Sequence, residues 1–119
     1  MSRPQRGAVT AELAMAVPLL LAITLGLVWL LSLATAQVRM VDATRETARA
    51  LARGDAPADA LARGRQVAPA GAALTVTTLA DQVVVSGSVR VDGVGGLFDA
   101  LPSVELTAEA VAAREDPPP

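Results

Sequence analysis

The sequence has no cysteine, histidine, lysine or tyrosine. Without cysteine it can form neither a disulfide framework nor a thiolate metal site. Without histidine and lysine it has no Ser-His or Ser-Lys nucleophile pair, no Schiff-base lysine and no nitrogen ligand for zinc. Carboxylates remain, but none is grouped in a metal loop or an acid/base pair. We therefore expect no enzymatic activity, no cofactor, no metal and no small-molecule substrate.

Aromatic residues and excess positive charge are also scarce. Trp29 and Phe98 are the aromatic residues, although 52% of the chain is hydrophobic, so a core would be built from alanine and valine. The net charge is −2, which argues against binding to nucleic acid. A folded part beginning near Gln37 is small, so we expect it to dock on its own helix or on neighbouring subunits.

The longest feature present is an apolar run from Leu13 to Ala36. No charged residue lies between Glu12 and Arg39. At about 1.5 Å per residue, a helix of this length can cross the roughly 30 Å hydrocarbon core of a bilayer. Proline and glycine inside the run are tolerated in membrane helices. We therefore expect residues 8–36 to form a single transmembrane helix that anchors the chain in the cell membrane.

The N-terminal edge of this run carries an unusual pattern of charge. Two arginines precede Gly7, and Glu12 follows it five positions later, where the apolar run begins. An ionised carboxylate near hydrocarbon is costly unless it has a cationic partner. Cleavage after Gly7 would create an α-amine on Ala8, four residues from Glu12 and on the same helix face.

This arrangement resembles a prepilin-type leader, in which a short basic peptide ends in glycine before a glutamate and a hydrophobic helix. The segment RGAVTAELAMAVPLLLAITLG, with the later DATRETARALARG, is similar to the TadE-like proteins of tight-adherence pilus systems, which are minor pilins or pseudopilins. The resemblance implies that a prepilin peptidase cuts between Gly7 and Ala8. It also implies that Glu12 contacts the N-terminal amine of a neighbouring subunit during filament assembly.

The same resemblance implies partners, location and a fold. Other pilins and pilus assembly proteins would be partners, and the C-terminal domain would be extracytoplasmic or incorporated into a pilus.

Ala8 stands where major type IV pilins have an aromatic residue, and Leu13 follows the acid, so methylation of Ala8 is left open. Counting basic residues does not favour this orientation, because two arginines precede the run and four follow it closely.

Two alternatives remain open from the residues alone. The chain could be an uncleaved, single-pass adaptor in an envelope complex, in which Glu12 merely favours the start of a helix. The small residues of Ala34-Thr35-Ala36 also fit a secretory cleavage site that would release a small domain from Gln37. The apolar run is longer than the apolar region of a typical signal peptide, which argues against secretion.

The segments on either side of the apolar run are predicted to differ in secondary structure. Pro4 argues against a helix in the polar leader, residues 1–7. The membrane helix is expected to continue to Arg53 and to stop at Gly54. Pairs three residues apart, Asp42 with Arg45 and Glu46 with Arg49, could form ion pairs. The apolar stripe of this extension is predicted to consist of Val38, Val41, Ala48, Leu51 and Ala52.

The remaining residues predict a short helix and a small sheet. A helix is expected at Pro57–Val67, and alternation predicts strands at Leu74–Leu79, Val83–Val91 and Val104–Ala112. A hairpin at residues 80–82 joins the first two strands. A helical turn around residues 97–101 and a disordered tail at 114–119 complete the prediction. In the second strand Val83, Val85, Val89 and Val91 are predicted to share one face, and in the third Val104, Leu106, Ala108 and Ala110 are predicted to point inward. The fold class is therefore α+β and pilin-like, with residues 37–113 forming the helix extension and a small domain.

Overall fold

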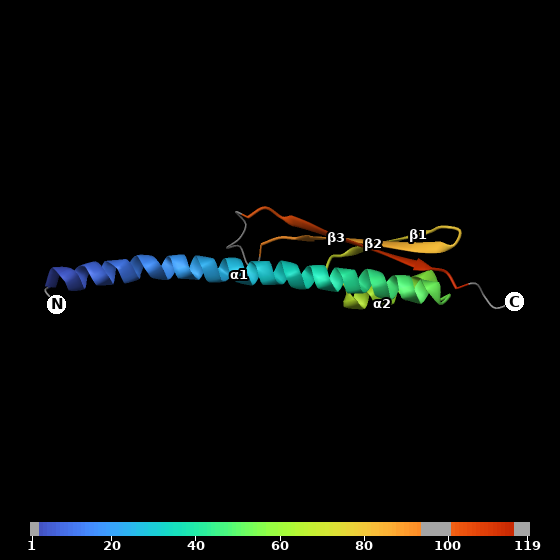
Figure 1. Cartoon of the computed structure of the whole chain (residues 1–119), viewed down its shortest axis with the longest axis horizontal. Helices are drawn as coiled ribbons and strands as arrows, with labels where there is room; N and C mark the ends of the chain where they lie inside the picture. The colour runs from blue at the N-terminus through green and yellow to red at the C-terminus, as the bar shows by residue number, and fades with distance from the viewer. Residues whose placement is uncertain (1–2, 94–100, 116–119) are drawn as a thin grey trace. The chain divides into compact units, whose positions relative to one another are not determined.

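The computed structural model describes residues 3–93 and 101–115, which form two helices and a three-stranded antiparallel sheet (Figure 1). The elements are α1 (Arg3–Ala52), α2 (Pro57–Val67), β1 (Ala73–Thr78), β2 (Gln82–Val91) and β3 (Val104–Ala113). The predicted α+β class, with a long N-terminal apolar helix, a short second helix and a small antiparallel sheet, is confirmed. The chain divides into two compact units, Met1–Ser32 and Leu33–Pro119.

The first unit contains the N-terminal part of α1. Each of its described residues is exposed or half-buried. The exposed side chains include large apolar ones around the helix, among them Leu13, Leu20 and Leu31. A helix that is apolar on all sides belongs in a protein core or in a membrane. Among the described residues, α1 is the one helix that is long and apolar enough to cross a membrane, and its most apolar window is not buried in the protein.

Residues 3–7 of the predicted leader are helical, so the prediction that Pro4 keeps this segment out of a helix is wrong. Helix α1 begins at Arg3, so Pro4 lies in its first turn. The backbone N–H groups of a first turn have no acceptor within the helix, so proline removes nothing there. Pro18 lies inside α1 and does remove one helical hydrogen bond.

The outer part of α1, in the second unit, buries a different face from the predicted apolar stripe. Val38 is 60% exposed, and of the five predicted stripe residues only Ala48 is buried. Two buried threonines are satisfied locally, because Thr44 Oγ1 donates to the Val41 carbonyl at 2.9 Å and Thr47 Oγ1 to the Ala43 carbonyl at 2.8 Å. The buried residues of α1 are Met40, Ala43, Thr44, Thr47, Ala48 and Ala50.

Close approach of other elements explains why small and hydroxyl side chains are buried here. A Cβ atom on Gly64 of α2 would collide with Thr47 Oγ1 and lie 3.3 Å from the Ala43 carbonyl oxygen. A Cβ on Gly87 of β2 would lie 2.5 Å from Met40 Sδ and 3.0 Å from Thr44 Cγ2. Both elements therefore approach α1 more closely than any larger residue would permit, and valines on α1 would not fit between them.

Gly54 ends α1 as predicted. Its φ of 89° lies in the left-handed region that favours glycine. Its N–H donates to the Leu51 carbonyl at 3.0 Å, and the Asp55 N–H donates to the Ala50 carbonyl at 3.1 Å. This is the Schellman pattern, which satisfies carbonyl groups at the helix end and turns the chain towards α2.

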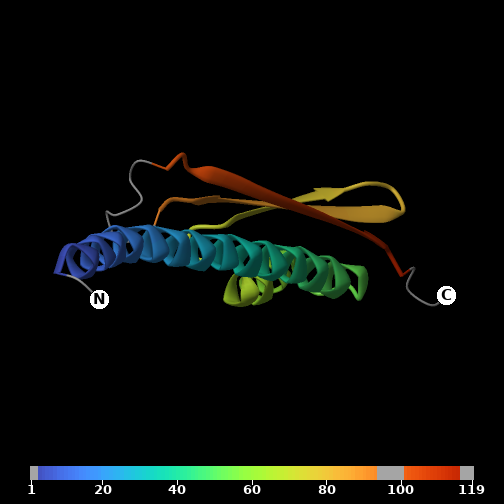
Figure 2. The same ribbon diagram turned by 60° about the vertical axis from the view of Figure 1, so that its left-hand side comes forward.

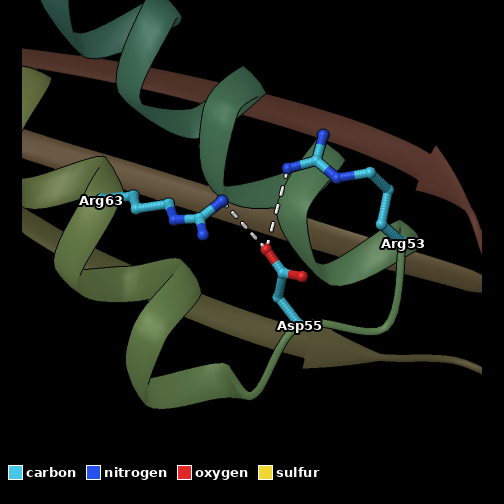
Figure 3. Close-up of polar contacts among 3 residues, drawn as sticks. All are labelled: Arg53, Asp55 and Arg63. Atoms are coloured by element: carbon cyan, nitrogen blue, oxygen red, sulfur yellow. Dashed lines mark ion pairs between the residues drawn. The ribbon is translucent and has the colours of Figure 1, made fainter.

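Asp55 links the two helices electrostatically (Figure 3). Its Oδ2 atom lies 3.7 Å from Arg53 Nη2 and 3.1 Å from Arg63 Nη1. That oxygen is buried but has no hydrogen bond of good geometry, so the attraction is between charges. These are the ion pairs among the described residues, and neither of the two pairs predicted along α1 forms. The two predicted pairs would join exposed side chains, and an exposed ion pair is only slightly more stable than the two separately hydrated charges.

The three strands follow the order β1-β2-β3 and lie along the outer part of α1 in both views (Figures 1 and 2). The predicted hairpin closes with a 2.8 Å hydrogen bond from the Leu79 N–H to the Gln82 carbonyl. The four valines predicted to share one face of β2 lie on its inner face, where Val83, Val85 and Val89 are buried and Val91 is half-buried. On β3 the inward and outward residues alternate as predicted: Val104, Leu106, Ala108 and Ala110 are half-buried, and Glu105, Thr107 and Glu109 are exposed.

The core of the second unit is small. Ala48 of α1 packs against Val83 and Val85 of β2, with half-buried residues from β1 and β3 around them. The predicted turn at residues 97–101 lies outside the described residues except for Leu101. Of the predicted disordered tail, residues 116–119 also lie outside them.

Candidate processing and assembly site

The Gly7–Ala8 peptide bond lies on an exposed stretch of α1. Both residues are exposed and helical, and a Cβ added at Gly7 would meet no atom within 4 Å. Gly7 is not one of the glycines with positive φ. Glycine in a helix costs about 1 kcal/mol relative to alanine. Neither packing nor backbone conformation therefore requires glycine at this position.

Glu12 is exposed on the same helix, one turn after Ala8. Within the described part of the chain it takes part in no ion pair. The structure therefore places Ala8 and Glu12 on one helix face, as their spacing predicts, and leaves the carboxylate available to a group from outside the chain. A cationic group would be favoured there, because apolar side chains follow immediately.

The leader offers two exposed arginines, Arg3 and Arg6, on the N-terminal side of the peptide bond. The Thr10 hydroxyl donates to the Arg6 carbonyl at 2.9 Å, parallel to the helical hydrogen bonds. A peptidase needs an extended backbone around the bond it cuts, so the first turns of α1 would have to unwind for cleavage. Helix ends open at little cost, because their first N–H groups have no intrahelical acceptors.

The surface of the sheet offers no evident chemistry. A hollow of about 370 Å³ on its outer face is lined by small side chains, hydroxyls and one carboxylate, that of Glu109. Ser86 lies opposite Glu109 in the strand register, but the chain has no histidine to act as the base between a serine and a carboxylate. Within residues 3–93 and 101–115, no three histidine, cysteine or acidic residues are grouped to hold a metal ion.

Sequence reasoning missed a second feature, a groove between α1 and β3. Its lining residues are Arg45, Ala48, Arg49, Ala52, Ala110, Val111 and Ala112. In the sequence these two arginines are four residues apart on a helix, but no sequence pattern shows which strand will lie beside them. A sheet edge next to a basic helix face is therefore a result of the tertiary structure.

Comparison with known proteins identifies the segment that holds the candidate site. The family model described as TadE-like protein matches residues 7–49. No curated protein and no solved structure matches the chain. The resemblance predicted from the sequence is thus confirmed over this segment, which begins at Gly7 and includes Ala8, Glu12 and most of α1. A TadE-like segment connects the chain with tight-adherence pilus systems and with membranes.

Proposed function

We propose that this chain is a minor pilin or pseudopilin of a tight-adherence pilus system. A prepilin peptidase cuts it after Gly7, and the mature chain begins at Ala8. Helix α1 remains in the cell membrane until assembly, with the small α+β domain on the extracytoplasmic side. The mature protein is then inserted into the filament or primes its growth, together with other pilins and assembly proteins.

The observation that carries this proposal is the coincidence of three features at one place. The TadE-like match begins at Gly7, a glycine that the fold does not require. Glu12 takes part in no ion pair with any residue that the structure describes, and it lies at the start of the apolar run. The helix that follows is exposed along its apolar length. A filament subunit needs all three, whereas a simple membrane anchor needs only the last.

Glu12 has a specific role in this proposal. In the membrane its carboxylate is costly to keep near hydrocarbon, and the α-amine of Ala8 on a neighbouring subunit offsets that cost. Two opposite charges close together in a medium of low dielectric attract strongly. The pair therefore forms when subunits associate side by side, which couples cleavage of the leader to entry into the filament.

The mature N-terminus tests this function directly. The protein is purified from membranes of its native host, and its N-terminal residue is identified by mass spectrometry. A start at Ala8 supports prepilin-type processing. An uncut leader would leave a membrane-anchored adaptor in an envelope complex, and a start at Gln37 would identify a secreted small domain.

A further inference from the structure

The groove between α1 and β3 combines a basic wall with a floor of small residues. Arg45 and Arg49 are exposed and take part in no ion pair within the described residues. Alanines from α1 and β3 line the groove between them, and its volume is about 250 Å³. The same arginines border a second hollow that contains Asp42 and Glu46, but no carboxylate lines the groove on the β3 side.

The outer edge of β3 presents unpaired backbone groups to this groove. The Arg114 N–H donates to the Asp81 carbonyl at 3.0 Å, and this pair continues the register that matches Gln82 with Ala113. Hydrogen-bonded and non-hydrogen-bonded pairs alternate in antiparallel sheets. Residues 108, 110 and 112 therefore point their N–H and C=O groups at β2, whereas 107, 109, 111 and 113 point theirs outwards.

Two contacts with α1 agree with this assignment and limit the free edge. Gln37 Nε2 donates to the Thr107 carbonyl at 3.1 Å, and the Glu115 N–H donates to the Ala52 carbonyl at 3.3 Å. Thr107 of β3 and Glu115, two residues after the end of β3, both belong to the outward series. Between these ties, the outward groups of Glu109, Val111 and Ala113 have no partner in the described part of the chain. Helix α1 and strand β3 thus run in the same direction. The edge of β3 contacts α1 at Thr107 and just after its end at Glu115, and between these two contacts its outward backbone groups are free within the described residues.

We infer that this groove binds an extended segment of another protein, which adds a strand to the β3 edge and places two carboxylates on Arg45 and Arg49. The arginines are four residues apart on a helix, a rise of about 6 Å. Carboxylates two residues apart on a strand are separated by about 6.8 Å. The spacings match, and the intervening backbone would pair with the edge at Val111.

A second copy of this chain does not fit the groove. The sequence contains no two acidic residues separated by two positions. The glutamates of β3 itself are four apart, a separation of about 13 Å on a strand, and cannot meet both arginines. Antiparallel pairing of two β3 strands would also bring the arginines of two α1 helices to the same side of the sheet, where they repel. The partner is therefore a different protein.

Two seven-residue peptides of equal composition test the inference on the full-length protein in detergent micelles. SVEVEAT has its glutamates two apart, and SEVAVET has them four apart, each with blocked ends and a fluorescent label. Fluorescence anisotropy measures their dissociation constants. We expect SVEVEAT to bind saturably and several-fold more tightly than SEVAVET.

Variants test the arginines of α1 and the backbone edge of β3 separately. Arg45→Glu with Arg49→Glu is expected to weaken SVEVEAT binding at least about ten-fold, whereas Arg65→Glu with Arg90→Glu, a matched charge change outside the groove, leaves it unchanged. Val111→Pro removes an outward N–H without breaking a bond to β2, and is expected to cause a similar loss. Glu105→Pro removes an outward N–H outside the groove and is the matched control.

Each other outcome overturns the inference. Equal binding of the two peptides would mean that only net charge matters. Retained binding in the Val111→Pro variant, with loss in the arginine variant, would exclude strand addition. If neither peptide binds and the arginine variant loses only its association with phosphatidylglycerol vesicles, the arginines serve a lipid surface. None of these outcomes depends on cleavage after Gly7, so the proposed function is tested separately.

Discussion

At the scale of single residues, the glycines of this chain have distinct physical roles. Gly54 supplies a positive φ, and Gly64 and Gly87 permit close approach of α2 and β2 to α1. Gly7 does neither, because it is helical, exposed and surrounded by open space. Gly26 shares these features, so what distinguishes Gly7 is its place between the basic residues and Glu12, and its role in processing remains a proposal.

Gly7→Val is expected to block removal of the leader while the chain still folds. The added side chain meets no atom of the folded protein, but it enlarges the residue that the peptidase must accept. Immunoblots of native-host membranes should show the uncut form alone. Gly26→Val is the matched control, because Gly26 also lies in α1 with open space around it, and it should be processed normally. Normal cleavage of the Gly7 variant would contradict the proposed processing site.

Glu12→Ala is expected to be cleaved normally and to be absent from filaments. The variant keeps the leader and the apolar helix but lacks the carboxylate that we propose meets the α-amine of a neighbouring subunit. Quantification of the protein in sheared pili against the membrane fraction measures the effect, and Glu105→Ala, on the outer face of the sheet, is the control. Pili that contain the Glu12 variant in normal amounts would refute the assembly role.

At the scale of elements, the sequence predicted each helix and strand but not the face of α1 that is buried. The period-two spacing of Val83, Val85 and Val89 set the inner face of β2, and Gly54 after Arg53 set the end of α1. The burial of Thr44 and Thr47 was not predictable, because it depends on the close approach of α2 and β2 through their glycines. The apolar stripe of one helix cannot show how near its neighbours lie.

Gly64→Ala is expected to destabilise the second unit by about 1–3 kcal/mol, the usual cost of overpacking. The new methyl group collides with Thr47 Oγ1. Chemical unfolding of the full-length protein in detergent, followed by circular dichroism, measures the loss. Adding Thr47→Ala removes the colliding hydroxyl, so the double variant should be more stable than additivity of the two single changes predicts. Strict additivity would show that this contact does not limit the approach of α2.

Gly54→Ala tests the end of α1 independently of packing. The φ of 89° costs a residue with a Cβ about 1–2 kcal/mol, although no atom lies within 4 Å of the added group. The same unfolding measurement should show this loss. Gly26→Ala, in a helical position with open space, should show no loss. Equal stability of the two variants would mean that a positive φ at residue 54 is not needed to end α1.

At the scale of the whole molecule, the candidate processing site and the folded core use different residues. Gly7 and Glu12 lie in the first unit, whereas every buried residue of the described chain lies between Met40 and Val89, in the second. The site residues Gly7, Ala8 and Glu12 are predicted from the sequence alone, because the basic residues, the acid and the apolar run are contiguous, and their roles stay a prediction. The sequence could not predict the groove, which joins residues more than fifty positions apart.

This separation predicts that residues 33–119 fold without the apolar helix, whereas residues 57–119 do not. The shorter fragment lacks Met40, Ala43 and Ala48, which form the helical wall of the core. A core this small supplies no more than about 3–5 kcal/mol, so loss of one wall should abolish folding. Cooperative thermal unfolding, followed by circular dichroism, is expected for the longer fragment and not for the shorter one. If the shorter fragment unfolds cooperatively, the sheet and α2 are stable without α1, and the Gly64 and Gly87 contacts are not what holds the second unit together.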